Sequence, residues 1–301
     1  MKFKAFIFLL LCIGWANAGA QSFKWQAELG NVSANGFHKI ALTPQIISKT
    51  ESTDLADIRI FEKDKEIAYL IRKIADSIYI KDTTGLQLQN YTPIPAPSVS
   101  VKEDKANQRS IVLIRFNAGY QIDKLLLNPG GFQYYRRTAW LTETNPLIRN
   151  KKSNYSEDRL ANFIISSGKL PVIDLCGQNR YKQLFLVIEN EESEPLLIKN
   201  IKAYQKNMEL IAYLEKDKPY VIKAGQLNMQ LPRYDLRYFS DSISNPIPFI
   251  NVLNFKINKE EAVVKDSASS KKSWMWIAIG LLILFLSYLS YYVIKDMQRN
   301  K

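Results

Sequence analysis

The sequence predicts an all-β body of two sandwich lobes, followed by one C-terminal transmembrane helix. Three observations support this prediction. Short apolar segments separated by turn residues fill most of the chain between 21 and 258, which is typical of strands. A proline-rich run interrupts these segments at 92–97. The stretch 273–294 is apolar and long enough to span a bilayer.

The N-terminal segment 1–20 has the pattern of a secretory signal peptide. Lys2 and Lys4 precede an apolar stretch that is too short to span a bilayer and that ends in overlapping Ala-x-Ala cleavage signals. We place cleavage after Ala20, with cleavage after Ala18 as the alternative. We therefore expect the mature chain to lie outside the cytoplasm.

The first lobe is predicted over 21–95. Its expected strands are 23–29, 36–43, 57–61, 66–71, 77–80 and 86–88. The run Thr92–Pro97 has three prolines in six residues, so it cannot join a central strand. We expect this run to be an interdomain linker.

The second lobe is predicted over 96–206, and strands at this spacing suggest an antiparallel sandwich. Its expected strands are 99–102, 110–116, 124–127, 133–142, 160–165, 172–175, 184–189 and 196–204. The remaining segment, 207–258, is too short for a core of its own and is expected to pack on an earlier lobe. Whether it forms one sandwich with 21–95 stays open.

Two segments follow the body. The polar segment 259–272 would form a stalk, and the segment 273–294 has aromatic residues near both ends, as membrane spans have. The basic segment 295–301 would then be a cytoplasmic tail. This layout predicts a single-pass type I protein of the bacterial inner membrane, with its body in the periplasm.

Composition narrows the chemistry. The 301 residues carry a formal net charge of +12, of which the signal peptide supplies +2 and the segment 271–301 supplies +4, so the exported body carries 12 − 2 − 4 = +6. A mildly basic body suits an anionic glycan or lipid headgroup, but such a charge is more often only a solvated surface. The exported location and the lack of a recognition motif argue against nucleic acid as a partner. Only Cys176 remains after signal cleavage, within a predicted buried strand, so no intramolecular disulfide can form. Cysteine usage and Asn-, Lys- and Ile-rich composition indicate a bacterial envelope protein.

The single histidine offers little for catalysis. His38 has no second histidine or nearby cysteine, so we expect an ordinary residue on a strand surface. No glycine-rich phosphate loop or Gly-x-Ser-x-Gly motif occurs. The sequence therefore predicts no metal, no cofactor and no catalytic residue.

The second lobe contains an Asp-Lys-Leu strand at Ile122–Leu127 and an Arg-Tyr strand that begins at Arg180. Together with 111–116, 132–137, 184–190 and 195–198, these strands resemble the discoidin-like, galactose-binding type of jelly roll. The resemblance covers about 100 residues and implies a jelly roll whose ligands bind the loops at one end of the sandwich.

The whole layout is similar to an uncharacterised bacterial family of exported proteins, a domain of unknown function with one C-terminal span. The similarity is carried by Asp57–Phe61 with Ala68-Tyr69, and by Pro232–Leu236. The family has a Gly-Asn pair in the turn before the second motif, where this chain has Ala224-Gly225-Gln226. The similarity implies a fold and an envelope location, without an activity.

The candidate ligand-binding surface is the loop 142–158, which is long, polar and basic. Its candidate contact residues are Arg149, Lys151, Lys152, Asn154 and Tyr155. A second run suggests stacking on a sugar: Phe132, Tyr134, Tyr135, Arg136, Arg137 and Trp140. Because alternate residues of a strand face opposite sides, we expect at least half of this run in the core.

These features favour a non-enzymatic binding or scaffold protein of the envelope, which recognises a glycan or a membrane-protein partner through the jelly-roll loops. One alternative is an accessory subunit that contacts a polytopic membrane protein through its transmembrane helix. A second alternative is a carbohydrate-active enzyme that uses a pair of carboxylates.

Overall fold

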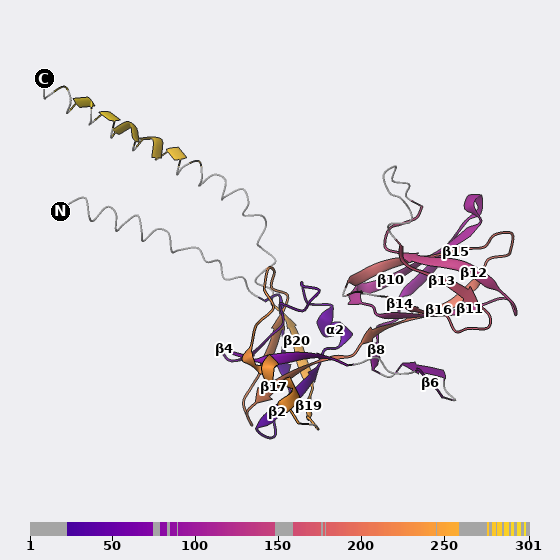
Figure 1. Ribbon diagram of the computed structural model, residues 1–301, viewed down its shortest axis with the longest axis horizontal. Coiled ribbons are helices and arrows are strands. Elements are labelled where there is room, and N and C mark those ends of the chain that lie inside the picture. Colours follow the sequence, from indigo (N-terminus) through magenta and orange to yellow (C-terminus); the bar gives the residue numbers. More distant parts are fainter. Residues whose placement is uncertain are drawn as a thin grey trace. The chain divides into compact units, whose positions relative to one another are not determined.

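The structure is a computed structural model, which describes residues 23–74, 79–82, 85–88, 90–147, 159–175, 177, 179–244, 246–258 and scattered positions of 276–298. The chain divides into two units, one that ends at Ile257 and one from Asn258 to Lys301. The described residues of the first unit are mostly in strands, which confirms the all-β class (Figure 1). Among the described residues, no helix is both long and apolar enough to cross a membrane.

The first sandwich has two antiparallel sheets with one parallel pair at an edge. One sheet has the order β20 (Val252–Ile257), β1 (Trp25–Leu29), β18 (Val221–Ala224), β3 (Arg59–Glu62), β4 (Lys65–Ile67). The other has the order β19 (Phe249–Ile250), β2 (Gly36–Ala41), β17 (Met208–Leu214), β5 (Tyr69–Lys73). Segments 23–74 and 207–257 therefore share one core, in which β1 lies between β18 and β20.

The second sandwich is one continuous segment. Its larger sheet has the order β13 (Arg159–Ser166), β12 (Arg136–Thr142), β15 (Arg180–Glu189), β10 (Arg109–Gln121), β9 (Ser98–Asp104). Its smaller sheet has the order β14 (Val172–Asp174), β11 (Lys124–Gly130), β16 (Leu197–Lys206), β8 (Tyr91–Pro93). Alternate residues such as Val112, Ile114 and Leu186 point between the sheets and are fully buried.

Short elements complete the described chain. They are the hairpin β6 (Tyr79–Asp82) and β7 (Gly85–Leu88), the helix α2 (Pro44–Ile47), and the 3₁₀ helices η2 (Lys105–Asn107) and η3 (Asp235–Ser242).

The proline-rich run is part of the second sandwich, so the prediction of a linker was wrong here. Tyr91–Pro93 pairs with β16, and the Ile94 amide donates to the Ala203 carbonyl at 2.9 Å. The Ile94 side chain is buried in the core. Because β8 lies at a sheet edge, only one side of its backbone needs ladder hydrogen bonds, and Pro93 is tolerated there.

One strand runs from the second sandwich into the first. β16 ends at Lys206 and β17 begins at Met208, so only Asn207 separates them. In β16 the odd-numbered Ile201 and Ala203 face the core, whereas in β17 the even-numbered Leu210 and Ala212 do. The strand thus presents opposite faces to the two cores.

Candidate functional site

The predicted ligand-binding residues lie outside the described part of the chain. Arg149, Lys151, Lys152, Asn154 and Tyr155 all fall between 148 and 158, and Cys176 is likewise outside the described residues. The loop therefore stays a prediction.

The aromatic-basic run does not form one surface. β12 begins only at Arg136, and Tyr134, which precedes it, is 82% exposed. Trp140 is buried, but in a small cluster with Phe185 and Val187 that is separate from the core between the sheets. The Arg159 guanidinium lies 4.1 Å from the Trp140 ring centroid, which is cation–π geometry. Trp140 is thus covered rather than available for stacking.

His38 is buried, so the prediction of a surface residue was wrong. It lies on the inner face of β2 with Ile40, and its Nδ1 atom is 2.9 Å from the Gly36 carbonyl oxygen. A strand residue two positions from a core isoleucine must share its face. In the described ranges, no group of three or more His, Cys, Asp or Glu could hold a metal ion.

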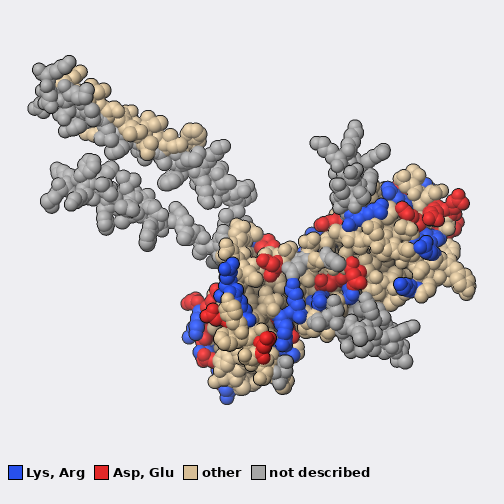
Figure 2. All heavy atoms as spheres, in the orientation of Figure 1, with Lys and Arg blue, Asp and Glu red and all other residues tan. Residues whose placement is uncertain are grey.

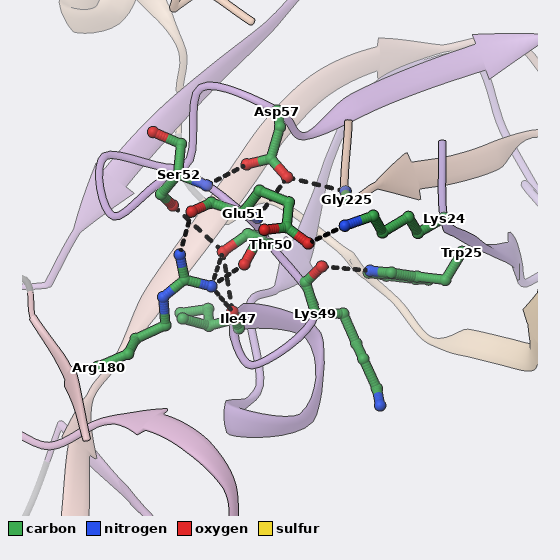
Figure 3. A network of polar contacts seen from close by, with 10 residues as sticks. All are labelled: Lys24, Trp25, Ile47, Lys49, Thr50, Glu51, Ser52, Asp57, Arg180 and Gly225. Atoms are coloured by element: carbon green, nitrogen blue, oxygen red, sulfur yellow. Dashed lines mark hydrogen bonds and ion pairs between the residues drawn. The ribbon is translucent and has the colours of Figure 1, made fainter. Parts of the chain in front are cut away.

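A network of polar contacts lies where the two sandwiches meet, and Figure 3 shows its side chains. Arg180, the first residue of β15, donates to the loop that follows α2. Its Nη1 atom is 3.3 Å from the Ile47 carbonyl oxygen and 2.9 Å from the Thr50 hydroxyl, and also contacts the Thr50 carbonyl. Its Nη2 atom is 2.7 Å from the Glu51 carbonyl oxygen. One guanidinium therefore joins β15 to three backbone carbonyls, of which only that of Ile47 belongs to α2.

A buried carboxylate holds the same loop from within the first sandwich. Asp57 has no exposed surface, and its Oδ2 atom accepts hydrogen bonds from the Glu51 amide at 2.7 Å and the Gly225 amide at 2.8 Å. Its Oδ1 atom accepts from the Ser52 amide at 3.2 Å. Three backbone donors satisfy this carboxylate, as its burial requires.

Gly225 occupies a position that suits glycine. Its φ is +88°, and a Cβ atom there would lie 2.9 Å from Lys24 Cβ and 3.3 Å from the Lys49 carbonyl oxygen. That carbonyl also accepts from Trp25 Nε1 at 3.1 Å. The turn before the Pro232–Leu236 motif thus needs glycine for both backbone conformation and space.

Hydrogen bonds around Asn207, where the chain passes from β16 to β17, also link the two sandwiches. The Ile74 amide donates to the Asn207 carbonyl at 3.1 Å, and the Asn207 amide donates to the Asn90 carbonyl at 2.8 Å. Gln205, buried at the end of β16, donates from Nε2 to the Leu42 carbonyl at 3.0 Å. Leu42 belongs to the first core, so this bond joins the two sandwiches directly.

The electrostatics of the junction favour a fixed structure. Burial lowers the pKa of the Arg180 guanidinium, while the charges of Asp57 and Glu51 act in the opposite direction. A guanidinium stays protonated in proteins, so the loop lies between the Arg180 cation and the Asp57 carboxylate. Figure 2 shows positive and negative side chains interspersed on the visible surface, so charge alone marks no site in that view.

A second buried cation, Arg59, contacts the chain after β18 at Gln230. Arg59 donates to the carbonyls of Ala56 and Ile58, both at 2.6 Å, and to the Gln230 carbonyl at 2.9 Å, and its Nε atom is 3.1 Å from Glu66. The Tyr234 hydroxyl donates to the Glu66 carboxylate.

Tyr69 packs edge-on against Tyr234, with ring centroids 5.2 Å apart. Burial raises the pKa of Tyr69 to about 12, although the charge of Arg59 opposes this.

Neither network was predicted as a site. Asp57 and Arg59 alternate with Ile58 and Ile60, which suggests a strand with one exposed polar face, yet all four side chains are buried. Arg180 was noted only as part of a strand pattern. Its partners are about 130 residues away in sequence, so no local pattern could find them.

No family model, curated protein or solved structure matches this chain.

Proposed function

We propose that this protein is a membrane-anchored binding scaffold of the bacterial envelope. Hydropathy supports an anchor at 273–294 and a signal peptide at 1–20. The second sandwich would be a discoidin-like jelly roll, and its two antiparallel sheets are compatible with that fold. Its end loops, including 142–158, would contact an envelope glycan or a membrane-protein partner.

The observation that carries this proposal is the junction between the sandwiches. Independent domains on a flexible linker would be joined by few contacts. Here one strand passes through Asn207 into the other sandwich, Gln205 bonds to Leu42, and Arg180 caps three carbonyls. A body tied in this way presents a binding surface at a fixed place relative to its other half, which suits a scaffold.

The test is a pull-down from native envelopes in detergent, with the full chain compared with Arg180→Ala. The matched control is Arg115→Ala, because Arg115 is an exposed arginine of the same sandwich. A scaffold that needs a fixed junction should lose its co-purifying partner, or a bound glycan, at least in part with Arg180→Ala and not with Arg115→Ala.

Two outcomes would count against the proposal. If Arg180→Ala retains every partner at wild-type yield, a fixed junction is unnecessary for binding. If a chain that carries only 259–301 captures the same membrane protein, the accessory-subunit alternative is correct and the helix is the contact.

A further inference from the structure

The outer face of the sheet β19-β2-β17-β5 carries exposed aromatic rings. Phe37 of β2 lies opposite Tyr213 of β17, and Phe249 of β19 lies beside Lys39 of β2. The inner-face neighbours His38 and Ile40 are buried, so Phe37 and Lys39 must face outward.

These rings are accessible. Tyr213 is 50% exposed and Phe249 is 62% exposed, although both are large apolar side chains. Phe37 packs edge-on against Tyr213, with ring centroids 5.6 Å apart, and this contact orients the tyrosine ring. We call Phe37, Lys39, Tyr213 and Phe249 the aromatic face.

The aromatic face also holds a cation without a carboxylate. The Lys39 ammonium lies 4.1 Å from the Phe249 ring centroid, and no ion pair joins it to an acidic side chain of the described residues. A cation–π contact leaves the ammonium able to bind an anion from the open side. The face is therefore complementary to a ligand with both an apolar surface and a negative charge.

The distance between Tyr213 and Phe249 fits an oligosaccharide better than a single sugar. Tyr213 and Phe249 are two strands and two residues apart, so their Cα atoms are separated by roughly 12 Å from standard strand spacing. A single sugar ring cannot cover both aromatic rings at that separation, whereas an oligosaccharide can. Pyranose rings present an apolar face of C–H groups that packs on aromatic rings, and uronic acids add a carboxylate.

A polar row continues the same sheet face. Arg72 of β5 pairs with Glu209 of β17, with Nη2 and Oε1 3.1 Å apart. The other carboxylate oxygen of Glu209 is buried and accepts no hydrogen bond from the described residues. That oxygen is itself inaccessible, so the polar group of this row that a ligand can reach is the Arg72 guanidinium, whose side chain is 38% exposed.

We propose that the aromatic face binds an acidic oligosaccharide, with Tyr213 and Phe249 stacking on sugar rings and Lys39 pairing with a carboxylate. This deepens the proposed scaffold function, on whose envelope location it rests. It places the glycan on the first sandwich rather than on the loop 142–158.

The test measures binding of two oligosaccharides to the full chain in detergent by calorimetry. The probes are a hyaluronan hexasaccharide, which alternates glucuronate with N-acetylglucosamine, and neutral chitohexaose. The acidic probe should bind more tightly. Tyr213→Ala should weaken binding of the acidic probe about tenfold. Lys39→Gln should remove the preference for the acidic probe.

The matched control is Tyr134→Ala, because Tyr134 is an exposed tyrosine of the second sandwich and should not affect binding. An unchanged far-ultraviolet circular dichroism spectrum would show that each variant folds. If Tyr213→Ala and Phe249→Ala bind like the wild type while Arg149→Ala does not, the loop is the glycan site and this inference is wrong.

If neither probe binds, the inference also fails, but the scaffold proposal is judged separately by the envelope pull-down. If a photo-crosslinker at position 213 then captures the partner from that pull-down, the aromatic face is a protein-docking surface instead.

Discussion

The two sandwiches differ in how the chain builds them. The second uses one continuous segment, 91–206, whereas the first joins 23–74 to 207–257. In the first, the N-terminal strand β1 pairs with β18 and β20, both from the distant segment. Contacts of such long sequence separation form late and are costly to close. The first sandwich should therefore depend more strongly on the contacts that hold its two segments together.

Each sandwich contains one tryptophan, which makes the comparison measurable. Trp25 lies in the first core and Trp140 in the second sandwich, and the region 23–258 has no other tryptophan. With Trp15, Trp274, Trp276 and one of the two body tryptophans replaced by phenylalanine, the emission of the remaining tryptophan reports the unfolding of one sandwich. The following predictions use these two single-reporter backgrounds.

The largest effect is expected for Asp57→Ala. Removal of the carboxylate leaves the buried amide of Gly225 and the part-buried amide of Glu51 without acceptors. We expect the free energy of unfolding reported by Trp25 to fall by about 4 kcal/mol. Urea unfolding measures this loss, and the Trp140 transition should change much less.

The control for Asp57 is Asp174→Ala in the second sandwich. Asp174 pairs with Lys124 but its side chain is 61% exposed, so the loss should be below about 1 kcal/mol. Equal losses for the two variants would contradict the role given to the buried carboxylate.

A smaller effect is expected for Gly225→Ala. The new Cβ would press on Lys24 and the Lys49 carbonyl at a positive φ, so the Trp25 transition should lose about 3 kcal/mol. Gly168 of the second sandwich has an ordinary φ and nothing within 4 Å of a built Cβ. Gly168→Ala should therefore leave the Trp140 transition within about 0.5 kcal/mol of the wild type.

The smallest effect is a pH dependence of the first sandwich that comes from Tyr69. Because the folded pKa of Tyr69 is raised to about 12, the folded state keeps a proton that the unfolded state loses above its ordinary pKa near 10. This stabilisation is complete below pH 10 and is lost as the pH rises toward 12. We expect a fall of about 1 kcal/mol per pH unit in the Trp25 transition.

The variant Tyr69→Phe separates the contribution of Tyr69 to this pH dependence from that of other groups that titrate in the same range. The variant loses the hydrogen bond from the Tyr69 hydroxyl to the Ile58 carbonyl, so it should be less stable at pH 8. Its stability should then fall less steeply between pH 10 and 12 than that of the wild type. Parallel curves for the two proteins would rule out the proposed titration.

Local patterns sufficed for the fold class because strand periodicity is a property of neighbouring residues. Most expected strands are present, including Arg109–Gln121 and Arg180–Glu189 over the predicted 110–116 and 184–189. The run 92–97 was misassigned, because whether a proline suits an edge strand depends on which side of the strand is paired. His38 was misplaced for a similar reason, since polarity alone did not reveal the inward face of β2.

The candidate sites also differ in whether neighbouring residues or distant strands bring their side chains together. The aromatic residues Phe37, Tyr213 and Phe249 come from three separate parts of the sequence and meet only because β17 pairs with β2 and β2 pairs with β19. The run 132–140 looked more like a surface because its residues are adjacent in the sequence, yet it leads from exposed Tyr134 to buried Trp140.

By itself, the sequence determined the all-β class, and its hydropathy supports the expected signal peptide and anchor, because these depend on composition and periodicity within short windows. Only the tertiary structure decided that 23–74 and 207–257 form one sandwich and which face of each strand is buried. It also decided that Arg180 and Asp57 bind the same loop. The physical reason is that hydrogen bonding and burial depend on which distant segments meet. That pairing is chosen by the whole chain at once.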